Sequence, residues 1–212
     1  MKHILLFLPL LLFSCSNNSV KNTKTDKTVP VKEMTIESSQ KKYIARKELL
    51  EYVKNIKPNE FTQDYLNPFD SIRFNKVIAY DFDGKEERNI SVVDKYGFSK
   101  VIKKQKNLNK EQVTFLINFL TDTLTYGQST AACFEPGLGI VFFNNESVVY
   151  TIDICLDCNF LHSTTIIPAT QYTQMDSEDG TSYALDGFSQ KGKNNIIELC
   201  KQLGLEYGNR QY

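Results

Sequence analysis

The sequence predicts a single α+β domain in which antiparallel β-hairpins form a sheet packed by two or three helices. Segments with helical and with strand-like apolar spacing are mixed along the chain. Neighbouring strand-like segments are joined by short turns instead of crossover helices, which indicates antiparallel pairing. The length of 212 residues suits one domain with a sizeable core, and the sequence contains no internal repeat.

Three segments have the apolar spacing of helices, namely 42–56, 108–125 and 193–203. Pro58 closes the first segment, and Gly204 stops the third. The second segment is the clearest, because Asn109 suits the N-cap and Gln112 occupies the capping-box position. Its expected core-facing stripe consists of Val113, Leu116, Ile117, Leu120 and Leu124.

Five segments have the composition of strands, namely 76–82, 89–93, 138–143, 148–154 and 163–167. The dipeptide Asp83-Gly84 is typical of a tight hairpin turn, so we expect the first two of these segments to pair. The dipeptide Asn144-Asn145 predicts a second hairpin between the next two.

The first fifteen residues predict export. Residues 1–3 form a short positive start, and the apolar run 4–13 covers only about half of a bilayer core, as expected for a signal peptide. The run Leu12-Phe13-Ser14-Cys15 resembles a bacterial lipobox, which implies that residues 1–14 are removed and that Cys15 is lipidated.

The remaining organisation follows from composition. Ser16 resembles the sorting signal of outer-membrane lipoproteins, so we expect a periplasm-facing protein held to the bilayer through acylated Cys15. Residues 15–40 are polar and lack apolar periodicity, as expected for the lipidated cysteine and a flexible tether, and the α+β domain spans 41–208. With 25 basic and 25 acidic residues, the charge gives no support for nucleic-acid binding.

Four cysteines remain beyond the lipobox. Cys200 lies on the apolar face of the last predicted helix and is expected in the core. If the second hairpin turns between Asn144 and Glu146, Cys133 faces positions 156–158, beside the Cys155-Leu-Asp-Cys158 segment.

Four interpretations of this cluster remain open. A structural disulfide joins Cys133 to Cys155 or Cys158, as suits an oxidising compartment. A zinc site uses Cys133, Cys155, Cys158 and His162, a donor set that fits tetrahedral zinc. A thiol–disulfide oxidoreductase uses Cys155 and Cys158, although no helix is expected to begin there to stabilise a thiolate. The fourth interpretation is that all the thiols stay reduced and inert.

Two further motifs have simpler explanations. Asp81 and Asp83 at the end of a strand resemble the first motif of haloacid-dehalogenase-type phosphatases, in which the first aspartate is the nucleophile and the second the acid–base group. Lys85 departs from that family's pattern, and a hairpin turn already explains the segment. The acidic run 176–180 lacks the spacing of an EF-hand and predicts a solvated turn.

Two runs carry a family resemblance. Residues 132–142 and 152–159 resemble a C[FY]xPxxxIVF…IxICxxC pattern in uncharacterised lipoproteins of Bacteroidetes-type bacteria. The similarity covers about residues 100–160. The resemblance implies that Cys133, Cys155 and Cys158 belong to one unit, and it transfers no activity.

The expected function is therefore that of a lipid-anchored cell-envelope protein with an interaction or structural role and a disulfide-pinned hairpin. No catalytic residue is assigned and no cofactor is required. The alternative is a zinc-binding or thiol-redox domain built on Cys133, Cys155, Cys158 and His162. The expected partners are the lipid bilayer and an envelope protein.

Overall fold

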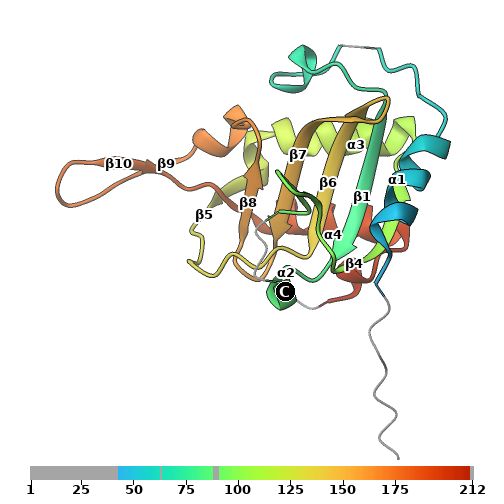
Figure 1. The fold of residues 1–212 in the computed structure, drawn as a ribbon. Coiled ribbons are helices and arrows are strands. Elements are labelled where there is room, and N and C mark those ends of the chain that lie inside the picture. The colour runs from blue at the N-terminus through green and yellow to red at the C-terminus, as the bar shows by residue number, and fades with distance from the viewer. Residues whose placement is uncertain (1–42, 63, 88–90, 211–212) are drawn as a thin grey trace, which may run out of the picture. The chain divides into compact units, whose positions relative to one another are not determined.

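The structure is a computed structural model that describes residues 43–62, 64–87 and 91–210 (Figure 1). The expected signal peptide, the lipidation site Cys15 and the tether lie outside these residues. No helix in the described part of the chain is both long enough and apolar enough to cross a membrane.

The helical elements are α1 (Arg46–Asn55), η1 (Phe69–Ser71), α2 (Gly84–Glu87), α3 (Lys110–Thr121), η2 (Thr123–Thr125), η3 (Pro168–Gln171), α4 (Gln190–Leu203) and η4 (Glu206–Asn209). The strands are β1 (Lys76–Phe82), β2 (Val93–Asp94), β3 (Gly97–Phe98), β4 (Ile102–Asn107), β5 (Tyr126–Gln128), β6 (Leu138–Asn144), β7 (Ser147–Cys155), β8 (Phe160–Ser163), β9 (Gln174–Asp176), β10 (Ser182–Ala184) and β11 (Gly187–Phe188). The expected α+β class is confirmed.

A five-stranded antiparallel sheet organises the domain, with strand order β4-β1-β6-β7-β8. Every residue of β1 is buried, because neighbouring strands occupy both of its edges and other elements cover both of its faces. The β6–β7 hairpin is confirmed. Its register shifts between Phe142 and Phe143, so the pairing beyond that point differs from a continuous ladder.

The larger core lies on the face of the sheet that α3 and α4 cover (Figure 1). Helix α3 begins after Asn109 because Asn109 and Gln112 make the expected reciprocal capping box. The apolar stripe of α3 then reaches the sheet through Val113, Leu116 and Leu120. Cys200 of α4 is fully buried in the same core, as expected.

A second core lies on the opposite face of the sheet. It is covered by α1, through Leu49 and Val53, and by the segment 91–101, through Val92 and Val101. Gly139 of β6 gives this segment room, because a Cβ atom there would lie 2.5 Å from Cβ of Val92. The segment 91–101 therefore lies directly against the sheet.

The expected hairpin at Asp83-Gly84 is wrong. Both edges of β1 pair with β4 and β6, so no edge remains for segment 89–93. The backbone N–H groups of Asp83 and Gly84 bond instead to the carbonyls of Val101 and Pro136, and the chain continues into α2. Long-range pairing here overrides the local turn preference of Asp-Gly.

Several element boundaries also differ from the expected ones. The first helix begins at Arg46 instead of residue 42, and the last begins at Gln190 instead of 193 because Ser189 caps it. The strand expected at 163–167 occupies Phe160–Ser163. Helix α3 ends at Thr121, and Leu124 lies in η2 with its side chain mostly exposed, so its assignment to the core-facing stripe is wrong.

Candidate functional site

The cysteine cluster is built around the connection between β7 and β8. Strand β7 ends at Cys155, the chain turns through residues 156–158, and β8 begins at Phe160. Asn159 adopts a left-handed backbone conformation (φ 55°), which asparagine tolerates better than most residues. The turn is closed by a hydrogen bond from the Asn159 N–H to the Leu156 carbonyl at 3.2 Å.

The segment that carries Cys133 is attached to this turn by hydrogen bonds. The Ala131 N–H donates to the Cys158 carbonyl at 2.9 Å, and the Asn159 side-chain amide donates to the Ser129 carbonyl at 2.9 Å. Further along, the Gly137 N–H donates to the Ile154 carbonyl at 3.1 Å. These contacts hold the segment 129–137 beside the connection, which is why Cys133 reaches Cys158.

Three sulfur atoms meet at this point, as the hairpin register leads one to expect. The Sγ atoms of Cys133 and Cys158 are 3.1 Å apart, and the Cys158 N–H donates to Sγ of Cys155 at 3.2 Å. All three are free thiols in this structure, since a disulfide bond measures about 2.05 Å. Cys133 is exposed, whereas Cys155 and Cys158 are buried.

The environment of Cys158 disfavours its thiolate. Burial raises the pKa of the Cys158 thiol well above its usual value, and its hydrogen bonds with the thiols of Cys155 and Cys133 raise it further. A thiol of this kind is a weak nucleophile at neutral pH, because exchange requires the thiolate. In its reduced state Cys158 is therefore a poor attacking thiol at neutral pH.

A small open cavity lies beside the exposed thiol. It has about 260 Å³ of space and is lined by Gly84, Lys85, Cys133, Phe134 and Glu135. Lys85 and Glu135 form an exposed ion pair of 3.8 Å at this cavity. Solvent and small reagents therefore have access to Cys133.

His162 does not join the cysteines. It lies on β8 directly opposite Asp153 in the strand register, its side chain is exposed, and its ring contacts that of Phe134. Among the residues that the structure describes, no group of three or more His, Cys, Asp or Glu side chains is placed to hold a metal ion. The four-ligand set expected for zinc is not assembled in this conformation.

Cys200 forms no part of the cluster. It lies on α4 against Gly208, whose missing Cβ lets η4 approach the helix. Burial raises the pKa of the Cys200 thiol to about 12, and the nearby carboxylate of Asp81 adds to this effect. Cys200 is a core residue, as its position in the sequence indicates.

The two aspartates that resemble a phosphatase motif lie in different environments. Asp81 is almost fully buried, and its Oδ2 accepts a hydrogen bond from the Tyr207 N–H at 2.9 Å. Asp83 forms an ion pair of 3.1 Å with Lys103. Because η4 covers Asp81, its carboxylate is closed to a phosphate ester, and the site lacks the open position that nucleophilic attack needs.

The acidic run 176–180 comprises the last residue of β9, Asp176, and the solvated turn expected here, which follows it. The Asp179 carboxylate accepts hydrogen bonds from the backbone N–H and the hydroxyl of Thr181 and pairs with the Ser177 hydroxyl. These bonds lower the pKa of Asp179 to about 2. Gly180, with φ of 83°, completes the turn.

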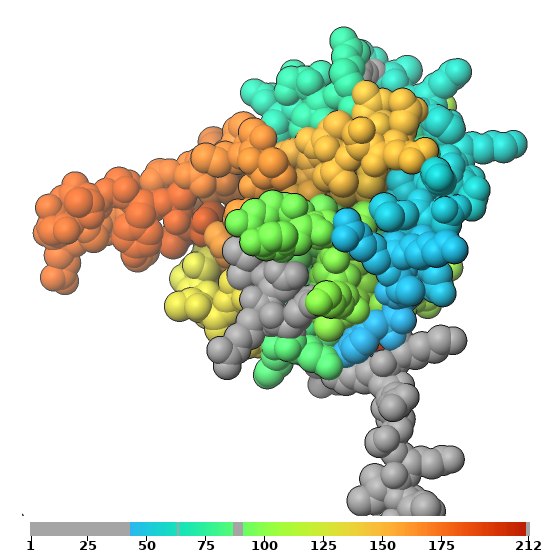
Figure 2. All heavy atoms as spheres, viewed as in Figure 1, coloured from blue at the N-terminus to red at the C-terminus, as the bar shows by residue number. Residues whose placement is uncertain are grey.

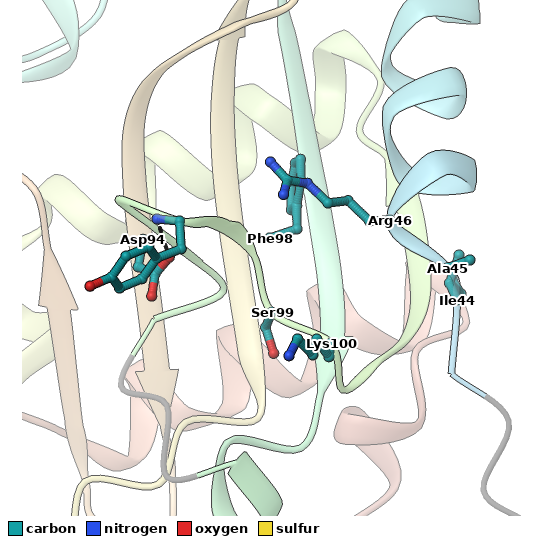
Figure 3. A pocket seen from close by; sticks show the side chains of 8 residues that line it. Ile44, Ala45, Arg46, Asp94, Phe98, Ser99 and Lys100 are labelled. Atoms are coloured by element: carbon teal, nitrogen blue, oxygen red, sulfur yellow. Dashed lines mark hydrogen bonds between the residues drawn. The ribbon is translucent and has the colours of Figure 1, made fainter.

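No sequence signal points to one further feature, a groove between α1 and the β2–β3 hairpin that Arg46 and Phe98 line (Figure 3). Arg46 and Phe98, on its two sides, are 52 positions apart along the chain, and the β2–β3 hairpin begins at Val93, the last residue of the segment whose pairing was wrongly expected. Comparison with protein-family models, curated proteins and solved structures finds no match to this chain.

Proposed function

We propose that this protein is a lipid-anchored component of the bacterial cell envelope, held in the outer membrane through acylated Cys15 and facing the periplasm. Its role is structural or interactive and not enzymatic. A disulfide between Cys133 and Cys158 holds the segment 129–137 against the base of the β6–β7 hairpin.

The observation that carries this proposal is the 3.1 Å separation between the Sγ atoms of Cys133 and Cys158. A movement of about 1 Å brings two such atoms to bonding distance. The exported location expected from the first fifteen residues supplies oxidising conditions. The raised pKa of Cys158 also favours the disulfide, because a thiol that resists ionisation does not stabilise the reduced form.

The interaction role is supported by the β9–β10 hairpin, which projects from the rest of the described domain (Figures 1 and 2). Its strands are only three residues long, and Met175 pairs with Tyr183 to present two large apolar side chains to solvent. Tyr172, at the base of the hairpin, is exposed as well. An isolated two-stranded hairpin is marginally stable, so a partner that covers these side chains would stabilise it.

Mapping thiols in the full chain tests the disulfide. Membranes are prepared under acid quench, and all free thiols are blocked with N-ethylmaleimide in a denaturant so that the buried ones react as well; the chain is then reduced and treated with iodoacetamide. We expect the second reagent on Cys133 and Cys158. Recovery of N-ethylmaleimide on Cys133 would contradict the disulfide, and one equivalent of bound zinc would favour the metal-binding alternative.

A second candidate function is thiol–disulfide exchange, which the position of Cys155 Sγ beside Cys158 favours. In that case Cys155 attacks the Cys133–Cys158 disulfide at Cys158, a Cys155–Cys158 disulfide forms, and Cys133 is released as a thiol. The same mapping then finds a mixture of the two disulfides. A single pairing that stays unchanged in a glutathione redox buffer would exclude this candidate.

The anchor and the interaction are tested in cells. Cys15→Ser should move the full chain out of the outer-membrane fraction, whereas Cys200→Ala should leave its location unchanged. A photocrosslinking residue at Tyr183 should give a discrete adduct with an envelope protein, and the same residue at exposed Leu66 should not. Equal adducts at both positions would contradict a specific interaction at the hairpin.

A further inference from the structure

The groove between α1 and the β2–β3 hairpin, called the α1 groove below, has two neighbouring compartments. One has about 480 Å³ of space and a mixed lining, polar and apolar in equal parts, that includes Asp94 and Lys100, and the other has about 330 Å³ and a mostly apolar lining. Arg46 and Phe98 line both compartments and therefore lie at their junction. These volumes fall in the range of small-molecule sites.

Arg46 is held at this junction by its close approach to the β2–β3 hairpin. Its side chain extends from the first turn of α1 towards Phe98 (Figure 3). Gly97, with φ of 109°, makes the approach possible, because a Cβ atom at this position would lie 2.5 Å from Nη2 of Arg46. Among the described residues no carboxylate forms an ion pair with Arg46. Its guanidinium is thus positioned and available to an anion.

The smaller compartment is suited to an aliphatic chain. Its floor includes Val53 of α1 and Phe143 of β6, both buried. Its rim includes Leu50 and Val148, whose side chains are 47% and 40% exposed, so apolar surface remains open to solvent. Leu50 lies one helical turn after Arg46, which places this apolar surface next to the guanidinium.

The two compartments differ in the charge of their linings. In the smaller compartment the carboxylates of Glu51 and Glu146 balance the cations of Arg46 and Lys54. In the larger compartment Lys100 accompanies Arg46, and the Asp94 carboxylate already accepts a hydrogen bond from the Tyr96 N–H at 2.7 Å. The lining of the larger compartment therefore carries a net positive charge, which favours an anionic group beside Arg46.

We propose that the α1 groove binds a small amphiphile with a carboxylate head and an aliphatic tail. The head pairs with the guanidinium of Arg46, whose planar donors match a carboxylate. The tail lies over Val53 and Phe143 and covers the exposed parts of Leu50 and Val148. This binding is independent of the cysteine cluster, so its failure would leave the proposed disulfide untouched.

Photolabelling of the full chain in membranes tests the proposal and avoids detergent. The probe is a decanoate analogue with a diazirine in its tail, and labelled residues are located by mass spectrometry of peptides. We expect saturable labelling at Leu50 or Val148. Decanoate should compete for the site at least tenfold better than decanol, which has the same tail without the charge.

Matched variants test the contacts of the carboxylate head and of the aliphatic tail separately. Arg46→Gln should reduce labelling at low probe concentration by about tenfold, and Arg73→Gln, at an exposed arginine outside the groove, should leave it unchanged. Leu50→Asp, at an exposed position, should also reduce labelling by introducing a charge beside the tail. Unchanged thermal unfolding shows that each variant is folded. Wild-type labelling in Arg46→Gln, labelling that does not saturate, or equal competition by decanol would overturn the proposal.

Discussion

The buried carboxylate of Asp153, on β7, accepts a hydrogen bond from the backbone N–H of Val92 at 2.8 Å. This bond joins the sheet to the segment 91–101, which covers one of its faces. The second oxygen of the carboxylate, Oδ2, has no hydrogen-bond partner among the described residues. Burial raises the pKa of Asp153 from 3.8 to about 6, although the nearby Ser91 hydroxyl and the hydrogen bond from the Val92 N–H oppose the shift.

This shift predicts that the protein loses stability as the pH rises towards neutrality. Between pH 3.8 and about 6 the folded state holds a proton on Asp153 that the unfolded chain has released. The stabilisation is fully present below the unfolded pKa and is lost as the pH rises through the folded pKa. The shift corresponds to roughly 3 kcal/mol, and urea unfolding at a series of pH values measures it.

Asp153→Asn is the matched test of that prediction. The amide keeps an oxygen acceptor for the Val92 N–H and carries no charge at any pH, so the variant should be more stable than the wild type at pH 7, by up to about 3 kcal/mol. Its stability should also vary less between pH 4 and pH 7. An identical pH profile in the two proteins would show that Asp153 does not cause the effect.

The proposed disulfide predicts a difference in stability between the oxidised and reduced chains. Cys133 and Cys158 are 25 positions apart, and closing a loop of this size stabilises the folded state by about 3 kcal/mol in the chain-entropy model. Unfolding should therefore occur at a lower urea concentration after reduction. Cys133→Ser should remove this difference, and Cys155→Ser should preserve it. Equal stability of the oxidised and reduced wild type would contradict the prediction.

Gly139 is a position of close approach between the sheet and the segment 91–101, and no sequence signal singled it out. A Cβ atom there would meet the side chain of Val92, so Gly139→Ala should destabilise the protein by about 1 to 3 kcal/mol. The double variant Gly139→Ala, Val92→Ala should lose less than the sum of the single variants, because the smaller residue 92 relieves the collision. Additive losses would show that the two residues do not interact.

The sequence predicted the fold class and the elements whose local signals agree with their tertiary surroundings. The cap at Asn109 and the stop at Gly204 lie where expected, and the second hairpin forms with its turn at Asn145-Glu146, one residue beyond the expected Asn144-Asn145. The Asp83-Gly84 turn failed because β1 is a central strand, and nothing local reveals that both of its edges are occupied. Two long-range strand pairings outweigh the local preference of Asp-Gly for a turn.

The candidate site, like the fold, could be predicted only in part from the sequence. The proximity of Cys133 to Cys158 follows from hairpin register, which the sequence carries in its turn residues. The separation of His162 from the cysteines could not be predicted from the sequence, because it depends on which residues of β8 pair with β7. The close approach of Arg46 to Gly97 could not be predicted either, because it joins a helix and a hairpin that are distant in the sequence.

The capping box of α3 provides the final prediction. The Asn109 side chain accepts a hydrogen bond from the Gln112 N–H at 2.8 Å, and the Gln112 side chain accepts one from the Asn109 N–H at 3.0 Å. Asn109→Ala removes the first bond and should reduce the free energy of unfolding by about 1 kcal/mol. Asn118→Ala, at an exposed position within the same helix, controls for the loss of an asparagine and should cost nothing, because alanine is the better helix former. Equal urea midpoints for Asn109→Ala and the wild type would show that α3 is held by its buried face alone.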